Sequence, residues 1–106
     1  MDTTTIEGPS LDALLAKLRQ QRPELRDLGV TSVSIYGSRA RGDNRRDSDL
    51  DLLIDYDHSR KFSLFDLVRV ERVLATATQL DVQVTTRDSV PELTCKRIEA
   101  ESVAVF

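Results

Sequence analysis

The stretch YGSRARGDNRRDSDLDLLIDY, residues 36–56, decides the fold, because it joins a Gly-Ser turn and several arginines to closely spaced aspartates. Its second part, residues 49–56, largely alternates acidic and apolar residues with the period of two that is typical of a β-strand. Alternate strand residues point to the same side, so Asp49 and Asp51 leave one face of the sheet together. Two carboxylates about 4 Å apart repel each other by roughly 4 kcal/mol at an effective dielectric near 20. A shared proton or a divalent cation would remove that repulsion.

A third carboxylate, Asp81, opens the next predicted strand, residues 80–86. It would join Asp49 and Asp51 if the two strands lie side by side. Oxygen-only ligands favour Mg²⁺, with Mn²⁺ as an alternative, over softer metals. Because Mg²⁺ binds through a few carboxylates together with substrate phosphates, these three metal ligands predict one or two Mg²⁺ ions, with two expected, and a phosphate-bearing substrate.

The loop before the aspartates supplies candidate nucleotide-binding residues. Gly37 lets the backbone approach a ligand closely, and amides at the start of a short helix predicted near Arg39 can bind phosphate. Ser38 can donate its hydroxyl to a phosphate oxygen, and the guanidinium groups of Arg39 and Arg41 can each grip a phosphate with two parallel bonds. Both arginines could instead face solvent or a partner protein. Ser48 is expected to cap the turn into the strand or to hold a loop amide.

These residues predict a division of labour. The Gly-Ser turn holds a triphosphate, the metal ions neutralise it, and an in-line displacement at the α-phosphorus expels pyrophosphate. Asp81 is the predicted general base for the incoming hydroxyl, because it would bind only the metal nearer to the nucleophile.

The rest of the chain predicts a small α/β (α+β) domain. The expected elements are a helix from Ser10 that ends at Pro23 and Gly29, strands 30–36 and 49–56, a helix 63–78, a strand 80–86, a final helix 91–101 and a short apolar tail. Helices packed on one face of a small mixed sheet would bury their apolar stripes. The length of 106 residues predicts one domain over residues 1–106.

Composition restricts the classes of partner. A net charge of -3 argues against binding bulk nucleic acid through its backbone, so no direct nucleic-acid binding is expected. The single cysteine, Cys95, rules out an intramolecular disulfide framework and a multi-cysteine metal site. The sequence contains neither a membrane-length apolar run nor a signal-peptide pattern, so we expect no membrane partner and a cytoplasmic protein.

Residues 37–54, GSRARGDNRRDSDLDLLI, resemble the nucleotidyltransferase signature of the DNA polymerase β-like superfamily, in which a Gly-Ser turn precedes a Ser-Asp-x-Asp strand. The short length and the Ala-Arg-Gly of the loop are most similar to the minimal nucleotidyltransferase (MNT) group. Asp81 matches the later third aspartate, and the tail IEAESVAVF, residues 98–106, also looks like the end of the family. The resemblance implies the polymerase β-like nucleotidyltransferase fold, ATP, Mg²⁺ and transfer of a nucleoside monophosphate to a hydroxyl.

The resemblance also implies a partner. Many MNT proteins are encoded beside a HEPN-domain RNase toxin and act as its antitoxin by adenylylating a tyrosine near the active site of the toxin. We therefore expect an adenylyltransferase that modifies a cognate HEPN toxin within a toxin–antitoxin hetero-oligomer. One alternative is a non-catalytic antitoxin that neutralises the toxin by binding. A second alternative is transfer of a nucleotide to a small drug or to RNA, although larger relatives use a second domain for this. A third is a subunit whose partner supplies the rest of the active site.

Overall fold

The computed structural model describes residues 9–106, so the first eight residues of the predicted domain 1–106 lie outside the described part. The helices are α1 (Leu11–Gln20), α2 (Arg22–Asp27), α3 (Ser38–Arg41), α4 (Leu64–Thr78) and α5 (Glu92–Glu101). The strands are β1 (Val30–Tyr36), β2 (Leu50–Tyr56), β3 (Val82–Thr86) and β4 (Val103–Ala104). The three strands and the helices expected from the sequence are present, and three elements, α2, α3 and β4, are short.

The strands form one mixed sheet in the order β3-β2-β1-β4. β1 is antiparallel to both β2 and β4, whereas β2 and β3 are parallel. A parallel pair needs a long crossover connection, which α4 supplies. Because β1 ends where β2 and β3 begin, the residues after β1 and the residues before β2 and β3 meet at one end of the sheet, which we call the Gly37 end.

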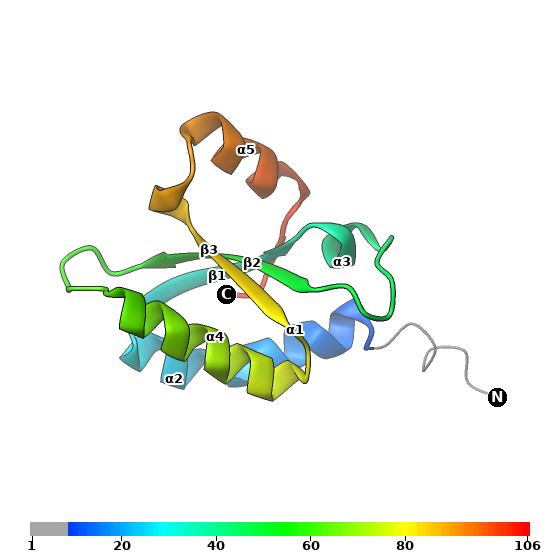
Figure 1. The fold of residues 1–106 in the computed structure, drawn as a ribbon, viewed down its shortest axis with the longest axis horizontal. Helices are drawn as coiled ribbons and strands as arrows, with labels where there is room; N and C mark the ends of the chain where they lie inside the picture. Colours follow the sequence, from blue (N-terminus) through cyan, green and yellow to red (C-terminus); the bar gives the residue numbers. More distant parts are fainter. Residues whose placement is uncertain (1–8) are drawn as a thin grey trace.

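The helices lie on both sides of the sheet. Figure 1 shows α1, α2 and α4 below the sheet, and α3 and α5 on the other side. The prediction of helices packed on one face is confirmed for α1, α2 and α4, which bury the main core. The fully buried core side chains from the sheet and these helices include Leu14, Leu18, Leu25, Val33, Ile35, Leu50, Leu52, Ile54, Val70 and Leu74. Leu53 points to the other face of β2 and is also buried, which gives that face a small apolar centre of its own.

The first helical segment differs from its prediction. Ser10 begins α1 as expected, with its hydroxyl accepting a hydrogen bond from the Ala13 N–H at 3.1 Å. The segment then breaks at Gln21, and Pro23 lies in the first turn of a second helix, α2. The prediction that Pro23 ends the helix was therefore wrong. Proline lacks an N–H, and the first turn of a helix is where that donor is not needed.

The apolar tail forms the edge strand of the sheet beside β1. It forms β4, which pairs with β1, and the N–H groups of Val105 and Phe106 donate to the carbonyl of Val33 at 2.8 and 3.3 Å. The guanidinium of Arg19 in α1 donates to the carbonyl of Val105 at 2.9 Å, so the tail is bonded both to the sheet and to α1.

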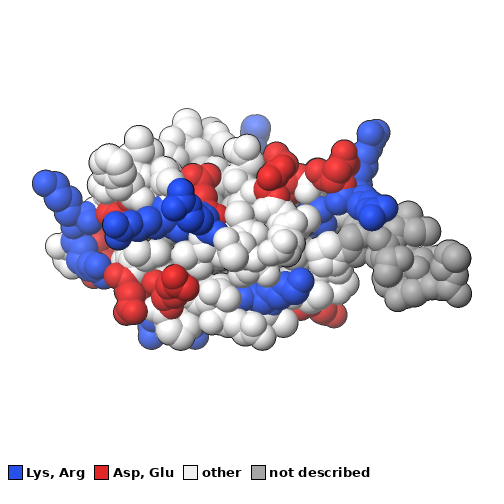
Figure 2. All heavy atoms as spheres, turned by 60° about the horizontal axis from the view of Figure 1, so that its bottom comes forward, with Lys and Arg blue, Asp and Glu red and all other residues white. Residues whose placement is uncertain are grey.

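The surface is electrically mixed. On the face turned toward the viewer in Figure 2, basic and acidic side chains are interspersed among uncharged ones. None of the helices formed by residues 9–106 combines the length and the apolar character needed to cross a lipid bilayer.

Candidate active site

The predicted site residues gather at the Gly37 end of the sheet. Tyr36 pairs with Asp51 across β1 and β2, so the Gly-Ser turn begins beside the aspartate pair. Leu50 pairs with Val82 across β2 and β3, and its N–H donates to the carbonyl of Asp81 at 2.9 Å. The turn, the aspartate pair and the third aspartate therefore follow one another across the ends of β1, β2 and β3.

Gly37 and Asp51 are in direct contact. Gly37 is buried and has φ 76° and ψ −155°, a backbone conformation that is essentially restricted to glycine. A Cβ at this position would lie 2.5 Å from Oδ2 of Asp51. The absence of a side chain at residue 37 is what lets the turn and the carboxylate lie against each other.

The aspartate pair is electrostatically strained. Asp51 is half-buried and Asp49 is exposed. Burial raises the pKa of Asp51, the negative charge of Asp49 raises it further, and the positive charge of Arg41 opposes both effects. Both aspartates therefore act on the same small region, and a pair of close, partly desolvated carboxylates fits a divalent cation that would relieve the repulsion.

Asp81 is exposed and directly precedes β3. Extending the β2–β3 register by one residue places it beside Asp49. Among residues 9–106, however, no three Asp, Glu, His or Cys side chains are gathered into a ready-made metal site. The three-aspartate ligand set therefore stays a prediction, and the position of Asp81 in the parallel register is its support.

Arg41 lies at the site but is engaged elsewhere. Its guanidinium pairs with the carboxylate of Asp43 at 3.1 Å and with that of Glu101, at the end of α5, at 3.3 Å. The side chain is 47% exposed, so these pairs are solvated and contribute little to stability. A triphosphate could therefore take Arg41 from both partners at little energetic expense. Sequence analysis did not identify either partner. Asp43 is only two residues from Arg41, but Glu101 is 60 residues away and no local pattern connects it to Arg41.

Ser48 and Arg39 hold the loop before Asp49. The Ser48 hydroxyl accepts a hydrogen bond from the Arg45 N–H at 2.8 Å, which is one of the two roles expected for it. Arg39 is only 3% exposed, and its guanidinium donates to the carbonyls of Arg46 and Ser48. Its proposed contact with the nucleotide stays a prediction, and its burial favours a role in holding the loop. Sequence analysis missed this role because a buried arginine and an exposed arginine look alike in a polar loop.

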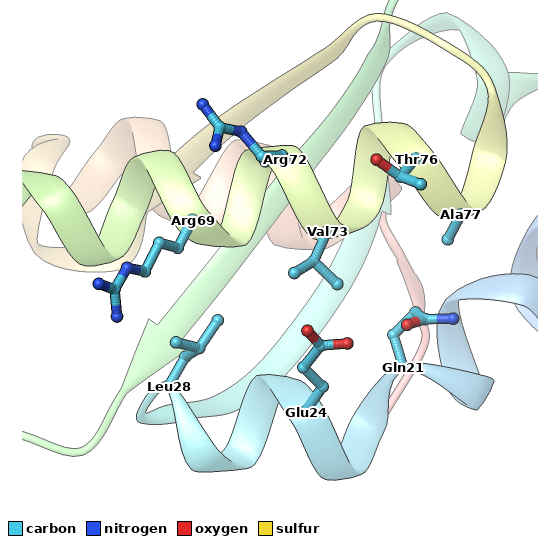
Figure 3. A pocket seen from close by; sticks show the side chains of 8 residues that line it. All are labelled: Gln21, Glu24, Leu28, Arg69, Arg72, Val73, Thr76 and Ala77. Atoms are coloured by element: carbon cyan, nitrogen blue, oxygen red, sulfur yellow. The ribbon is translucent and has the colours of Figure 1, made fainter.

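Two hollows border these elements. One of about 620 Å³ adjoins Asp81, between the end of α4 and residues 46–48. Another of about 490 Å³ lies between α2 and α4, where Val73 and Leu28 form apolar walls and Arg69 extends at the rim (Figure 3). The second hollow lies on the side of the sheet covered by α1, α2 and α4, and none of the predicted site residues lines it. The candidate active site is therefore the Gly37 end.

Comparison with known proteins decides the family. Residues 18–105 match the family described as nucleotidyltransferase domain, and this range includes the turn and all three aspartates. The chain belongs to the nucleotidyltransferase domain family. It is therefore an enzyme of the nucleotidyltransferase class, as the Gly-Ser turn and the Ser-Asp-x-Asp strand predicted.

Named relatives of this nucleotidyltransferase come from archaea. A candidate protein adenylyltransferase of Methanocaldococcus jannaschii is 37% identical over 79% of this chain and 88% of its own length. The protein adenylyltransferase MntA of Thermococcus cleftensis is 29% identical over 91% of this chain and 96% of its own length. Together with the family match, these similarities confirm the predicted recognition as a minimal nucleotidyltransferase.

A solved structure agrees with the fold. The nucleotidyltransferase is similar to a chain of the complex between a tri-AMPylated HEPN toxin and its MNT antitoxin from Shewanella oneidensis, with a TM-score of 0.60 over 87% of this chain and 71% of that chain. The identity is 15%, so this similarity shows the fold alone.

The raised pKa of Asp51 predicts a pH-dependent stability. A carboxyl whose pKa is higher in the folded state stabilises the fold below its unfolded pKa, about 3.9 for aspartate, and loses that contribution as the pH rises through the folded value. The free energy of unfolding of the metal-free wild type, relative to Asp51→Asn, should therefore fall as the pH rises above about 4.

Denaturant titrations at a series of pH values would measure this change. Asp57 provides a control of opposite sign, because hydrogen bonds from Ser59 lower its pKa and its contribution should be lost as the pH falls. An Asp51→Asn difference that does not vary with pH would contradict a pKa of Asp51 that burial and the charge of Asp49 raise.

Proposed function

We propose that this nucleotidyltransferase is an Mg²⁺-dependent adenylyltransferase that transfers AMP from ATP to a hydroxyl. The acceptor we propose is a tyrosine of a cognate HEPN RNase toxin, which the modification neutralises. The observation that supports the proposal is the contact between the Gly37 turn and Asp51, because the turn that we propose for phosphate lies against a carboxylate that we propose for the cation. The proposed place of action is the cytoplasm, in a hetero-oligomer with the toxin.

Each site residue has a proposed task. Asp49, Asp51 and Asp81 would hold Mg²⁺, or Mn²⁺ in its place, which when bound supplies charge neutralisation and acidifies the attacking hydroxyl. Ser38 donates its hydroxyl to a phosphate oxygen, and Arg41 leaves Asp43 and Glu101 to bind the departing pyrophosphate. Asp81 accepts the proton of the acceptor hydroxyl as general base.

The order of these residues across the sheet supports an in-line reaction. In an in-line displacement the nucleophile and the leaving group lie on opposite sides of the reacting phosphorus. The pyrophosphate-binding turn follows β1, and Asp81 precedes β3, with the aspartate pair of β2 between them. The leaving group and the acceptor hydroxyl therefore have separate places on either side of the pair.

The proposed partner is supported by the relatives. MntA of Thermococcus cleftensis is named a protein adenylyltransferase, and the similar chain from Shewanella oneidensis belongs to a complex of a tri-AMPylated HEPN toxin with an MNT antitoxin. A protein acceptor also suits a site at the exposed end of a sheet, because the acceptor brings its own folded surface to it.

A second candidate function is neutralisation by binding alone. Three large apolar side chains at the start of α4 are exposed, namely Leu64 at 74%, Phe65 at 81% and Val68 at 44%. An exposed apolar cluster of this kind is typical of a protein contact surface. Tight association with the toxin could therefore contribute to antitoxin function, with or without catalysis.

Intact-mass measurement distinguishes the two candidates. The chain would be incubated with ATP, Mg²⁺ and a candidate HEPN-type partner protein, and the partner would then be weighed. We expect a gain of one or more AMP units that is absent with Asp49→Ala. Neutralisation of the toxin by Asp49→Ala, with no mass gain in any sample, would instead favour the binding function.

A further inference from the structure

We propose that Arg39 is a positioning residue that connects the phosphate-binding turn to the aspartate pair. Its buried guanidinium ties α3, which begins directly after Gly37, to the loop that delivers Asp49 into the sheet. The proposal rests on the proposed adenylyltransferase function. In it, Arg39 acts through the backbone of Ser48 and does not touch the nucleotide.

The contacts of Arg39 are directed at two carbonyl groups of one loop. Nε and Nη2 donate to the carbonyl of Ser48 at 3.1 and 2.8 Å, and Nη2 also donates to the carbonyl of Arg46 at 3.2 Å. The Ser48 carbonyl belongs to the peptide bond that joins Ser48 to Asp49. Because a peptide bond is planar, fixing this carbonyl also fixes the direction in which the chain enters Asp49.

Apart from Arg39, the side chains and amides of residues 45–48 are held by local bonds only. The Arg45 N–H donates to the Ser48 hydroxyl at 2.8 Å, and the Ser48 N–H donates to the Arg45 carbonyl at 3.1 Å. These two bonds close a tight turn, but they do not place that turn relative to α3. Arg39 provides this placement, because its side chain starts in α3 and ends on the turn.

The chemistry of arginine suits this task. A planar guanidinium presents several donors in a fixed arrangement, so two carbonyls of one loop are held at set angles. A lysine ammonium lacks this planar arrangement, because its donors all sit on one nitrogen at the end of a flexible side chain. The requirement is therefore for arginine itself and not merely for a positive charge.

One donor of Arg39 indicates that stability alone did not select it. Nη1 is the single buried side-chain nitrogen or oxygen without a hydrogen-bond partner within residues 9–106. A buried unpaired donor destabilises a fold, so a side chain that made the same three bonds without the extra donor would serve stability better. Local departures of this kind are typical of functional positions.

The test replaces Arg39 by lysine and measures the loop and the reaction separately. Arg45→Lys is the matched control, because Arg45 lies in the loop that Arg39 holds, carries the same charge as Arg39 and has an exposed side chain. Hydrogen exchange reports the loop without any assay of activity, through the amide of Arg45. We expect Arg39→Lys to speed exchange of this amide about tenfold or more, with the buried β2 amides unchanged.

The reaction provides the second measurement. A displacement of about 1 Å in a reacting group can reduce a rate by about 100-fold, so kcat for AMP transfer should fall by this order in Arg39→Lys. The KM for ATP should change by less than about threefold, because in this proposal the guanidinium does not contact the nucleotide. Arg45→Lys should leave both constants and the exchange rate near their wild-type values.

Each other outcome has a definite meaning. Unchanged exchange at Arg45, or faster exchange with an unchanged kcat, would overturn the positioning role. A KM that rises as much as kcat falls would make Arg39 a nucleotide contact instead. If wild type transfers no AMP to any partner, the proposed function fails, and the exchange result alone still decides whether Arg39 holds the loop. Should Arg39→Lys not fold, Arg39→Gln, which buries no unpaired charge, is measured in the same way.

Discussion

Asp51→Asn is expected to lower the rate of AMP transfer by about 1,000-fold or more without unfolding the chain. Asparagine keeps the shape of the side chain against Gly37 but removes the charge that would hold the cation. Metal ions contribute several kcal/mol to stabilising charge in a transition state, and about 1.4 kcal/mol corresponds to a factor of ten in rate. The loss should appear in kcat and in the metal concentration needed for half-maximal activity.

Asp47→Asn is the matched control for this variant. Asp47 is an exposed carboxylate in the loop before β2, two residues before Asp49. Its replacement should change the rate by less than a few-fold. The free energy of unfolding of Asp51→Asn at neutral pH should be no lower than that of the wild type, because the substitution relieves the repulsion from Asp49. An Asp51→Asn protein that keeps more than a tenth of its activity would refute a metal-binding role for this residue.

Gly37→Ala should also abolish transfer, with a loss of about 100-fold or more, because it disturbs the turn and the aspartate together. The new Cβ would lie 2.5 Å from Oδ2 of Asp51 and 3.4 Å from its Cβ and Cγ. The backbone would also have to leave a conformation that costs a non-glycine residue about 1–3 kcal/mol. We therefore expect a lower free energy of unfolding as well as lost activity.

Gly42→Ala separates the two causes. Gly42 has φ 83°, so an alanine there is strained by about 1–2 kcal/mol, but a Cβ at this position meets no atom within 4 Å. It should lose stability while keeping most of its activity. Equal activity losses in Gly37→Ala and Gly42→Ala, measured at equal fractions of folded protein, would mean that the contact with Asp51 is irrelevant.

The strand pattern predicted the central part of the site for a simple physical reason. Side chains alternate in a strand, so an aspartate at every second position must share a face whatever the rest of the fold does. The burial of Leu50, Leu52 and Ile54 on the opposite face agrees with that prediction. Leu53 broke the alternation, because it is buried on the second face of the sheet, the side on which α3 and α5 lie.

Long-range relations were less accessible. The position of Asp81 depends on the parallel register of β2 and β3, and no local pattern specifies how a crossover helix aligns two strands. The break before α2 was missed because Pro23 can either end a helix or open one, and only packing decides between these. The buried state of Arg39 depends on carbonyls nine residues along the chain, in a loop with no periodic pattern.

The pairing of Arg41 with Asp43 and Glu101 has a consequence for the order of addition. Because Arg41 also pairs with Asp43 and Glu101, it offsets the charge of Asp51 only in part, and the Gly37 end keeps negative charge at Asp49, Asp51 and the nearby Asp81. Free ATP carries several negative charges of its own and would be repelled there. In the proposed reaction the nucleotide therefore arrives as its magnesium complex, and free ATP at concentrations above that of magnesium would act as a poor substrate rather than as a competitor.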